Sequence, residues 1–312
     1  MQTPRLIDPA TMTDAELSEV YALSRAGRLD AAPDEPAFSV EQMVASARSW
    51  PAAFRISEWV IEGGYAQLFR FGENKDCELE LVISPEARRS GLGTLLVGYV
   101  AEQARAAGCT MMLMPFADER GAAFTASLGA RNDNSWFVNV ITLPAVLEQV
   151  QPVPGYSVRS WQGPTPEELM ESWVRGLNAV KDAPHAAGTE PWVHTAQFVR
   201  GYEASLIAGG EQPRSTVILD AHGEAAAVTG LKVGLKPGAM ACTDVTAVVP
   251  EHRRRGLARW LKTESLAQLM ADRPDVPLMR TNNGVTNAGM LAVNRAVGFK
   301  PVATWTNAVI DL

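Results

Sequence analysis

The sequence predicts a mixed α/β protein made of two tandem copies of one unit, each a mixed, mostly antiparallel sheet with helices on both faces. Two observations indicate this. An apolar strand, a basic turn containing glycine and a helix occur around Arg88 and again around Arg253, 165 residues later in a chain of 312. The elements that hydrophobic periodicity predicts around each turn also follow one order in both halves. We therefore expect two domains, at 1–150 and 151–312.

Each half is predicted to run β-α-α-β-β-β-α-β-α-β. Thr13 is a candidate helix N-cap, Pro51 ends a helix, and Glu62-Gly63-Gly64 between two β-prone runs indicates a hairpin. The elements of the first half are expected as strand 5–7, helices 14–26 and 40–49, strands 54–61, 65–71 and 77–83, a helix from the turn to 107, strand 111–116, helix 121–128 and strand 135–143.

A proline-rich stretch, 144–155, indicates the boundary between the halves. Pro166 can begin a helix without losing a hydrogen bond. The second half is expected to contain strand 156–161, helices 166–180 and 195–208, strands 216–219, 225–233 and 242–249, a helix after the turn, strand 277–281, helix 287–297 and strand 302–310.

Composition indicates a globular protein that does not span a membrane. Hydrophobic residues make up 46% and charged residues 20% of the chain. No apolar run reaches the roughly 18 residues of a span, and residues 1–5 show no signal segment, so we expect a cytoplasmic protein. A net charge of −7 argues against a nucleic-acid or anionic-membrane partner. The spacing of the three cysteines and four histidines favours buried thiols and no metal site.

Each turn has the features of an anion-binding site. Free N–H groups at a helix N-terminus carry partial positive charge, arginines add full charges, and glycine lets an anion approach the backbone. An arginine-rich surface helix is the alternative for one copy, but two copies favour phosphate. The candidate residues are Ile83, Arg88, Arg89, Gly91 and Gly93 in the first half, and Thr246, Ala247, Val248, Arg253, Arg254, Arg255, Gly256, Leu257 and Ala258 in the second.

These motifs resemble the acetyl-CoA-binding core of the GNAT superfamily of N-acetyltransferases. In the second half, Arg-x-x-Gly-x-Ala is followed by Thr281-Asn282-Asn283, then by Asn287-Ala288-Gly289-Met290 and Gly298-Phe299. The resemblance covers both halves, more closely in the second, and the layout is similar to tandem members such as the mycothiol synthases and antibiotic-pathway proteins. It implies that acetyl-CoA binds at the turns and that each half has the GNAT order of elements.

The two halves differ at two positions that the resemblance marks as functional. The superfamily usually has an Asn that contacts the cofactor and a Tyr that protonates the departing thiolate. The second half has Asn287 and Asn294 there, and the first has Asp118 and Thr125. A carboxylate at 118 would repel an anionic cofactor, so we expect the second half to be catalytic. The alternative is that the first half, with its Gly91-x-Gly93 turn, is the active one.

Asp244 is the candidate general base, since it is the carboxylate on the strand before the second turn. Strand alternation predicts Asp244, Thr246 and Val248 on one face; a solvent-facing strand-end acid is the alternative. By resemblance, a backbone donor near Val248 stabilises the oxyanion. Asn294 can donate a hydrogen bond but cannot release a proton, and a structural role for it is equally open.

The loop between the first two helices of the second half is the candidate acceptor wall. Asp182, His185 and Glu190 would suit a substrate that carries an ammonium group, and a solvated loop is the alternative. We therefore expect an acetyl-CoA-dependent N-acetyltransferase that acts by direct transfer on a small amine, as a monomer. The open alternatives are a catalytically degenerate acyl-CoA sensor or interaction protein, and a longer acyl donor.

Overall fold

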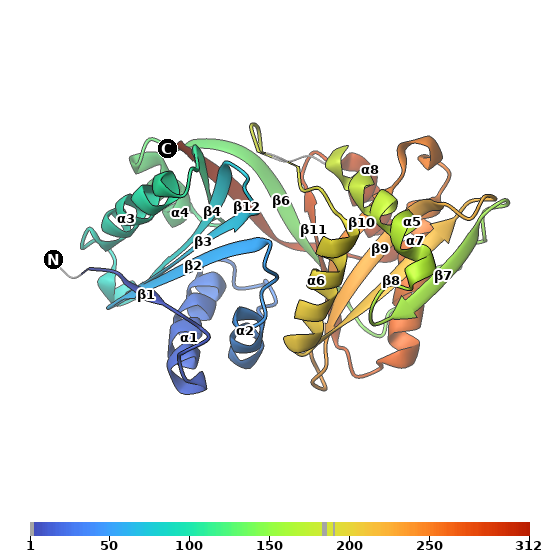
Figure 1. Cartoon of the computed structure of the whole chain (residues 1–312), viewed down its shortest axis with the longest axis horizontal. Coiled ribbons are helices and arrows are strands. Elements are labelled where there is room, and N and C mark those ends of the chain that lie inside the picture. The colour runs from blue at the N-terminus through green and yellow to red at the C-terminus, as the bar shows by residue number, and fades with distance from the viewer. Residues whose placement is uncertain (1–2, 183–185, 190) are drawn as a thin grey trace. The chain divides into compact units, whose positions relative to one another are not determined.

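The computed structural model describes residues 3–182, 186–189 and 191–312 (Figure 1). Its elements follow the predicted order in both halves, and their ends differ from prediction by a few residues in most cases. The first half contains β1 (Arg5–Ile7), α1 (Asp14–Ala31), α2 (Val40–Ala47), β2 (Phe54–Ile61), β3 (Gly64–Phe71), β4 (Asp76–Ile83), the 3₁₀ turn η1 (Pro85–Ala87), α3 (Leu92–Ala106), β5 (Met111–Phe116), α4 (Glu119–Ser127) and β6 (Arg131–Thr142).

The second half repeats this series. It contains β7 (Ser157–Gln162), α5 (Glu167–Asn178), η2 (Ala179–Asp182), α6 (Ala196–Ala208), β8 (Glu211–Leu219), β9 (Ala225–Gly234), β10 (Ala241–Val248), η3 (Pro250–His252), α7 (Leu257–Asp272), β11 (Leu278–Gly284), α8 (Ala288–Val297) and β12 (Lys300–Asp311).

Several elements are longer than the sequence indicated, and two of them, α1 and β8, show how the local sequence misleads. Helix α1 continues past Ala26 because Gly27 is the residue that lies against the sheet; a Cβ there would be 2.3 Å from Val82. Strand β8 begins at Glu211 although Pro213 argues against a strand. The pairing of β7 with β8 starts at Arg214, so Pro213 lies just beyond it.

The contacts divide the chain into two compact units that do not follow the sequence repeat. The first contains the described residues of 1–136, 185–190 and 303–312, and the second those of 137–184 and 191–302. The strand order is β1-β2-β3-β4-β5-β12 in the first unit and β6-β11-β10-β9-β8-β7 in the second. Strand β12 of the second half therefore completes the first sheet, antiparallel to β5.

In the first unit, α1 and α2 cover one face of the sheet, and α3 and α4 cover the other (Figure 1). Leu17 and Tyr21 of α1 pack on Tyr65 and Val82, whereas Leu96 and Val100 of α3 pack in a separate cluster with residues that include Leu79 and Met112. Strand alternation produces this division, because β4 buries Leu79 on one face and Val82 on the other.

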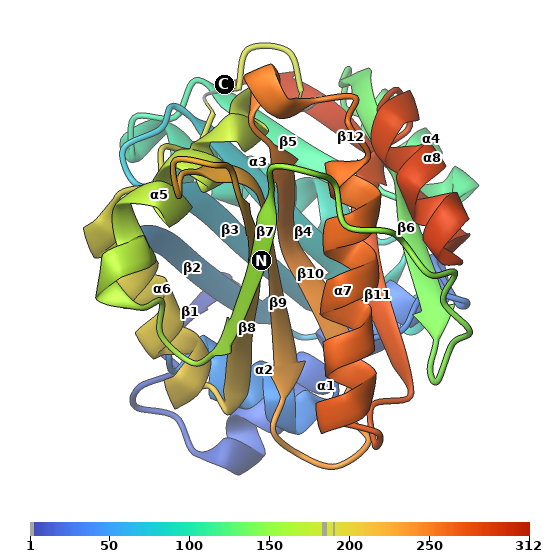
Figure 2. The same ribbon diagram turned by 90° about the vertical axis from the view of Figure 1, so that its right-hand side faces the viewer.

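The second unit has the same layers (Figure 2). Helices α5 and α6 cover the face that buries Val228 and Ala247, and α7 covers the face that buries Ala227 and Leu231. The proline-rich stretch after β6 packs on this unit, since Val150 and other apolar residues of that stretch contact the clusters beneath α7. Within the described residues, no helix is both long enough and apolar enough to cross a membrane.

Candidate functional site

The two basic turns have the same backbone conformation. Arg89 and Arg254 have φ values of 63° and 62°, and Gly91 and Gly256 have values of 86° and 83°. Within residues 3–182, 186–189 and 191–312, the two arginines are the non-glycine residues with positive φ. A left-handed conformation costs an ordinary residue about 1–2 kcal/mol, so its presence in both turns indicates a geometry that the fold imposes.

The first arginine of each turn holds the turn against the strand that precedes it. Arg88 Nε donates to the carbonyl oxygen of Ile83 at 3.2 Å, and Arg253 Nε donates to that of Val248 at 3.0 Å. Arg88 also pairs with Asp30 of α1 at 2.6 Å. These guanidinium groups therefore help to shape the turns, a role that their predicted charge toward a phosphate does not include.

Each turn ends at a glycine that caps a helix without a side-chain hydrogen bond. Gly91 is the N-cap of α3 and Gly256 is the N-cap of α7. A Cβ at either glycine would meet no atom of the described structure within 4 Å, so space is open beside both backbones. First-turn N–H groups of a helix have no intrahelical acceptor, and both helix starts therefore fit a phosphate.

Other predicted turn residues have structural roles. Leu257 is 1% exposed and packs with Trp260 and Leu261 in the core, so its backbone is the part available to a ligand. A Cβ at Gly93 would lie 3.1 Å from the ring of Phe124 on α4. Gly93 thus permits close packing between α3 and α4, whether or not a ligand is present.

The parallel strands on which the turns are built pair only at their beginnings. The pairing of β4 with β5 runs from Asp76 to Glu78, and that of β10 with β11 from Ala241 to Cys242, although all four strands are described in full and continue further. Beyond these points the facing backbone groups are not used by the neighbouring parallel strand. Ligands of open α/β sheets commonly bind where parallel strands end or part.

A β-bulge distinguishes the second unit from the first. The pairing of β10 with β9 shifts by one residue between Thr243 and Val245, whereas that of β4 with β3 has no shift from Glu78 to Ile83. When the sequences of the two halves are aligned on their turns, Asp244 is the extra residue in the second half, at the bulge. It has no counterpart in the first unit. Bulges occur often beside active sites, where they redirect a side chain.

The bulge overturns the predicted facing of Asp244. The expected grouping with Thr246 and Val248 is wrong, because Val248 packs on the α7 side whereas Asp244 accepts a hydrogen bond from Tyr202 of α6 at 3.0 Å. An inserted residue breaks strict alternation and places Asp244 on the same face as Val245. Asp244 therefore faces α5 and α6, the helices whose connecting loop we expect to bind the acceptor.

The side chain of Asp244 is enclosed while its backbone is open. The residue as a whole is exposed, but its side chain is only 21% exposed, so most of the accessible surface belongs to main-chain atoms. The pKa of the Asp244 carboxyl group is raised, because the effect of burial exceeds the opposite effects of Lys232 and of the hydrogen bond from Tyr202. Lys232 Nζ lies 3.9 Å from Asp244 Oδ1. Tyr202 and Lys232 could not be predicted as partners of Asp244, because helix and strand periodicity does not show which residues of different elements contact each other.

The two asparagines singled out in the second half have different environments. Asn287 caps α8 by accepting from the Met290 N–H at 3.1 Å, as Asp118 caps α4 by accepting from Gly121. Asn294 is 1% exposed; its amide donates to Asn283, and its Oδ1 has no partner within the described part of the chain.

The predicted repulsion at Asp118 is largely removed. Arg120 pairs with Asp118 at 2.5 Å and with Asp30 at 2.9 Å, so the carboxylate is neutralised locally. Thr125, at the position where the superfamily has Tyr, is 3% exposed and donates to the carbonyl of Gly121 at 3.0 Å. The charge of Asp118 therefore does not exclude an anion from the first turn.

The predicted acceptor loop is described only in part. His185 and Glu190 lie outside the described residues, as does the side chain of Asp182, whose backbone ends η2. The described portion, 186–189, belongs to the first unit: Ala186 packs with Met111, Leu113 and Val309. The roles of Asp182, His185 and Glu190 therefore remain predictions.

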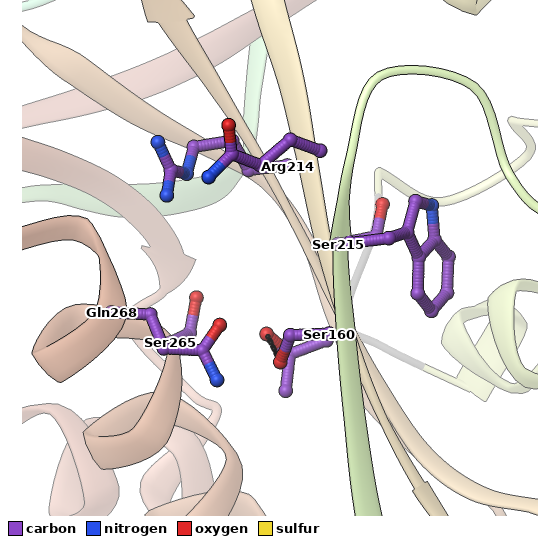
Figure 3. Close-up of a pocket in the computed structure, with 8 residues that line it drawn as sticks. Ser160, Arg214, Ser215, Ser265 and Gln268 are labelled. Carbon is purple, nitrogen blue, oxygen red and sulfur yellow. Dashed lines mark hydrogen bonds between the residues drawn. The ribbon is translucent and has the colours of Figure 1, made fainter. Parts of the chain in front are cut away.

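A separate polar pocket of about 90 Å³ lies between β7, β8 and the second half of α7 (Figure 3). Its lining includes Ser160, Arg214, Ser265 and Gln268, and Arg214 donates to the carboxylate of Asp272. Ser265 follows the start of α7 by about 12 Å along the helix axis, at 1.5 Å per residue. The pocket is therefore separate from the second basic turn.

The described residues contain no group of three or more His, Cys, Asp and Glu side chains arranged to hold a metal ion. Cys77, Cys109 and Cys242 are buried and free. Burial raises the pKa of Cys242 to about 11, so this thiol is protonated at neutral pH. The groups available for proton transfer near the second turn are thus oxygen and nitrogen groups.

Comparison with known proteins finds one family model that matches part of the chain and solved structures that share its fold. The acetyltransferase (GNAT) family model matches residues 23–129, which include the first turn. No curated protein matches the chain. A tandem GNAT protein from the clavulanic acid biosynthesis pathway superposes with a TM-score of 0.80 at 22% identity, covering 99% of this chain and 98% of that one. A GCN5-related N-acetyltransferase from Sphaerobacter thermophilus superposes with a TM-score of 0.73 at 15% identity, covering 99% and 95%.

The likeness to solved structures extends over nearly the whole chain, and the family match includes the first basic turn. Residues 23–129 match the acetyltransferase (GNAT) family model, and the chain as a whole has the fold of a tandem GNAT protein.

Proposed function

We propose that the protein is an acetyl-CoA-dependent N-acetyltransferase that transfers acetyl directly to a primary amine of a small molecule, and that the second unit carries the reaction. The observation that carries this proposal is the bulge at Asp244. It supplies an enclosed carboxylate and an open backbone in one residue, on the strand that leads into a phosphate-type turn.

The residues present in the second unit fit acetyl-CoA. The N-cap Gly256 has open space beside its backbone, and no side chain of the described structure occupies the first-turn N–H groups of α7. Arg254 and Arg255 add positive charge at the same turn, and Asn287 lies at the start of the next helix. Beyond Cys242, β10 and β11 no longer pair with each other, and we propose that the coenzyme arm lies against these strands there.

Bound acetyl-CoA supplies an acetyl group that is already activated as a thioester. We propose that the backbone N–H of the bulge donates to the carbonyl oxygen on which negative charge develops. The Asp244 carboxylate accepts a proton from the acceptor ammonium, so that the neutral amine can attack. The Tyr202 hydroxyl holds Asp244 Oδ1 at 3.0 Å and fixes the direction of that carboxylate.

The acceptor is proposed to be cationic because the proposed base, Asp244 of β10, is a carboxylate that would attract an ammonium group. Asp182, His185 and Glu190 are proposed to complete the acceptor wall, and Asn294 to hydrogen-bond near the leaving sulfur. The departing thiolate, whose conjugate acid has a pKa of about 8.5, needs no dedicated acid, because it or water takes the proton that the attacking nitrogen still carries. We propose that the chain acts as a monomer.

Release of thiol from acetyl-CoA tests this function. The intact chain is incubated with acetyl-CoA and a panel of small primary amines, and free coenzyme A is measured against calorimetric binding of acetyl-CoA. The proposal expects saturable binding together with amine-dependent thiol release. Binding without release for any amine would instead identify an acyl-CoA sensor, and release only from longer acyl thioesters would change the donor.

A further inference from the structure

The second unit buries polar atoms that have no hydrogen-bond partner among the described residues. Three of them lie on the α7 side of the sheet: Thr243 Oγ1 on β10, Lys262 Nζ on α7 and Asn294 Oδ1 on α8. Lys262 is 3% exposed and Asn294 is 1% exposed. A buried polar group without a partner destabilises the folded state, and more so when it is charged, so such groups call for an explanation such as a missing ligand.

The fold itself does not require polar residues at these positions. In the first unit the counterparts of Thr243 and Lys262 are Leu79 and Val97, which are buried in an apolar cluster. The counterpart of Asn294 is Thr125, whose hydroxyl donates to the carbonyls of Gly121 and Ala122. Unpartnered polar atoms at these positions are thus specific to the second unit.

Lys262 is the most demanding of the three because it can carry a charge. Its Nζ lies 5.2 Å from the centre of the Phe299 ring, which gives the ammonium form a weak cation–π contact. Burial alone lowers the pKa of Lys262 to about 7. A lysine held in this way is poised to gain a proton if an acceptor arrives.

Among the described residues, no acidic side chain forms an ion pair with Lys262, and no basic side chain beside it explains its lowered pKa. Asp244 of β10 and Arg280 of β11 lie with Cys242 on the α6 side of the sheet. Arg295 of α8 and Lys300 of β12 are exposed. The charged residues next to Lys262 on α7 are engaged elsewhere: Arg259 pairs with Glu148, and Glu264 accepts from Gln268.

We propose that Lys262 is a binding residue for the arm of acyl-CoA that joins the pyrophosphate to the thioester, with Nζ donating a hydrogen bond to an acceptor of that arm. This inference rests on the proposed function. Lys262 lies about 8 Å along α7 from the helix start at Leu257, at 1.5 Å per residue. This depth suits an arm that runs from the second turn along α7 toward the part of β10 that no longer pairs with β11.

A hydrogen bond from Nζ to the coenzyme favours the ammonium form, so binding raises the pKa of Lys262 and takes up protons. At pH 7.5 a group with a pKa of about 7 is protonated in about one quarter of molecules, and in the complex it is protonated in nearly all. Coenzyme binding to the second unit should therefore take up about three quarters of a proton at this pH.

Titration calorimetry of coenzyme A at pH 7.5, in two buffers of different ionisation enthalpy, measures this uptake. The intact chain carries Gly91→Glu, which blocks the first turn, so that the measured heat reports coenzyme binding at the second turn. Lys262→Met in the same background removes Nζ and keeps the side-chain length; Lys236→Met, at an exposed lysine, is the matched control. If Lys262→Met does not fold, Lys262→Val copies the first unit at residue 97. The ligand's own titration is common to all variants and cancels in the comparison.

We expect the uptake to fall by at least half a proton and the affinity by about tenfold in Lys262→Met, with both unchanged in Lys236→Met. Equal uptake in the parent and Lys262→Met, with binding retained, would overturn the inference and leave the proposed function standing. If neither the variants nor the unsubstituted chain gives any binding heat, both this inference and the proposed function are wrong.

Discussion

Arg89 and Arg254 have the same left-handed backbone conformation, at φ values of 63° and 62°, although 165 residues separate them. The hydrogen bonds from Arg88 to Ile83 and from Arg253 to Val248 repeat at the same spacing. A strained residue and its supporting bond have therefore been kept together in both copies. The duplicated feature is a specific turn geometry rather than a glycine-rich composition.

Replacing Arg254 by glycine should relieve the strain in the second turn. Glycine adopts positive φ without steric cost, although it loses more chain entropy on folding, so we expect a net gain of about 0.5–1 kcal/mol in the free energy of unfolding. Coenzyme affinity should fall at the same time, because one positive charge is lost. Urea unfolding checks the first effect, with Arg89→Gly as the matched variant; a loss of stability in both would show that the turns are not strained.

Asp244→Asn should lower kcat/KM by about 10²–10⁴ while coenzyme binding stays nearly unchanged, since an amide cannot accept the ammonium proton. Glu80→Gln is the control, because Glu80 faces α1 in the first unit, where it accepts from Ser24. Steady-state kinetics and calorimetry on the same preparations separate the two effects. Full activity in Asp244→Asn would remove this residue from the mechanism.

Tyr202→Phe should move the acidic limb of the kcat/KM profile to higher pH. The Tyr202 hydroxyl holds the pKa of Asp244 down by donating to the carboxylate, so its loss lets burial raise that pKa further. A base must be deprotonated to act, and the rate is therefore lost at a higher pH as the solution is acidified. A pH–rate profile measures the shift. A profile that keeps its acidic limb would show that Asp244 does not control it.

Lys262→Met should stabilise the protein, most strongly at or below pH 7. Burial holds the pKa of Lys262 at about 7 in the folded state, below its usual 10.5, so the unfolded chain binds the proton more readily. The penalty, about 3–5 kcal/mol, is complete below pH 7 and fades as the pH rises toward 10.5. Urea unfolding at pH 6.5 and 9 should show the advantage of the variant shrinking; a constant difference would contradict a titrating lysine.

Tyr65→Phe should destabilise the first unit by about 1–3 kcal/mol. Tyr65 is 1% exposed and donates to Glu58 at 2.6 Å, and Glu58, itself 3% exposed, also accepts from Tyr21 and Gln67. Removing one donor leaves a buried carboxylate less well satisfied. Thermal unfolding checks this, with Tyr99→Phe as the control at a partly exposed ring. An unchanged melting temperature would mean that the remaining donors satisfy Glu58.

The sequence was sufficient to predict the fold because its signals are local and occur twice. Strand, turn and helix around Gly91 and Gly256 could be recognised by pattern, and two copies of the same order supported each other. The division of the strands between the units could not be predicted in this way. Hydrophobic alternation in β12 shows that it is a strand, but it does not show that β5 is its partner.

The parts of the candidate site that are local in sequence could be predicted. The parts that depend on contacts between different helices and strands could not. The turn residues and Asp244 could be selected from sequence. The face of the sheet on which Asp244 lies could not be predicted. A one-residue bulge does not change the hydrophobic pattern, but it moves the side chain to the opposite face. Tyr202 and Lys262 gave no signal of their own, since an aromatic or a lysine in an amphipathic helix is ordinary.

The most direct measurement is amine-dependent thiol release from acetyl-CoA by four variants of the intact chain. Gly256→Glu places a carboxylate in the second turn, and Gly256→Ala imposes the same backbone strain without the charge; Gly91→Glu and Gly91→Ala do so in the first turn. The account predicts that Gly256→Glu loses at least 100-fold of the activity of Gly256→Ala, while Gly91→Glu and Gly91→Ala remain close to each other. Activity abolished by Gly91→Glu and retained by Gly256→Glu would assign the reaction to the first unit and contradict the account.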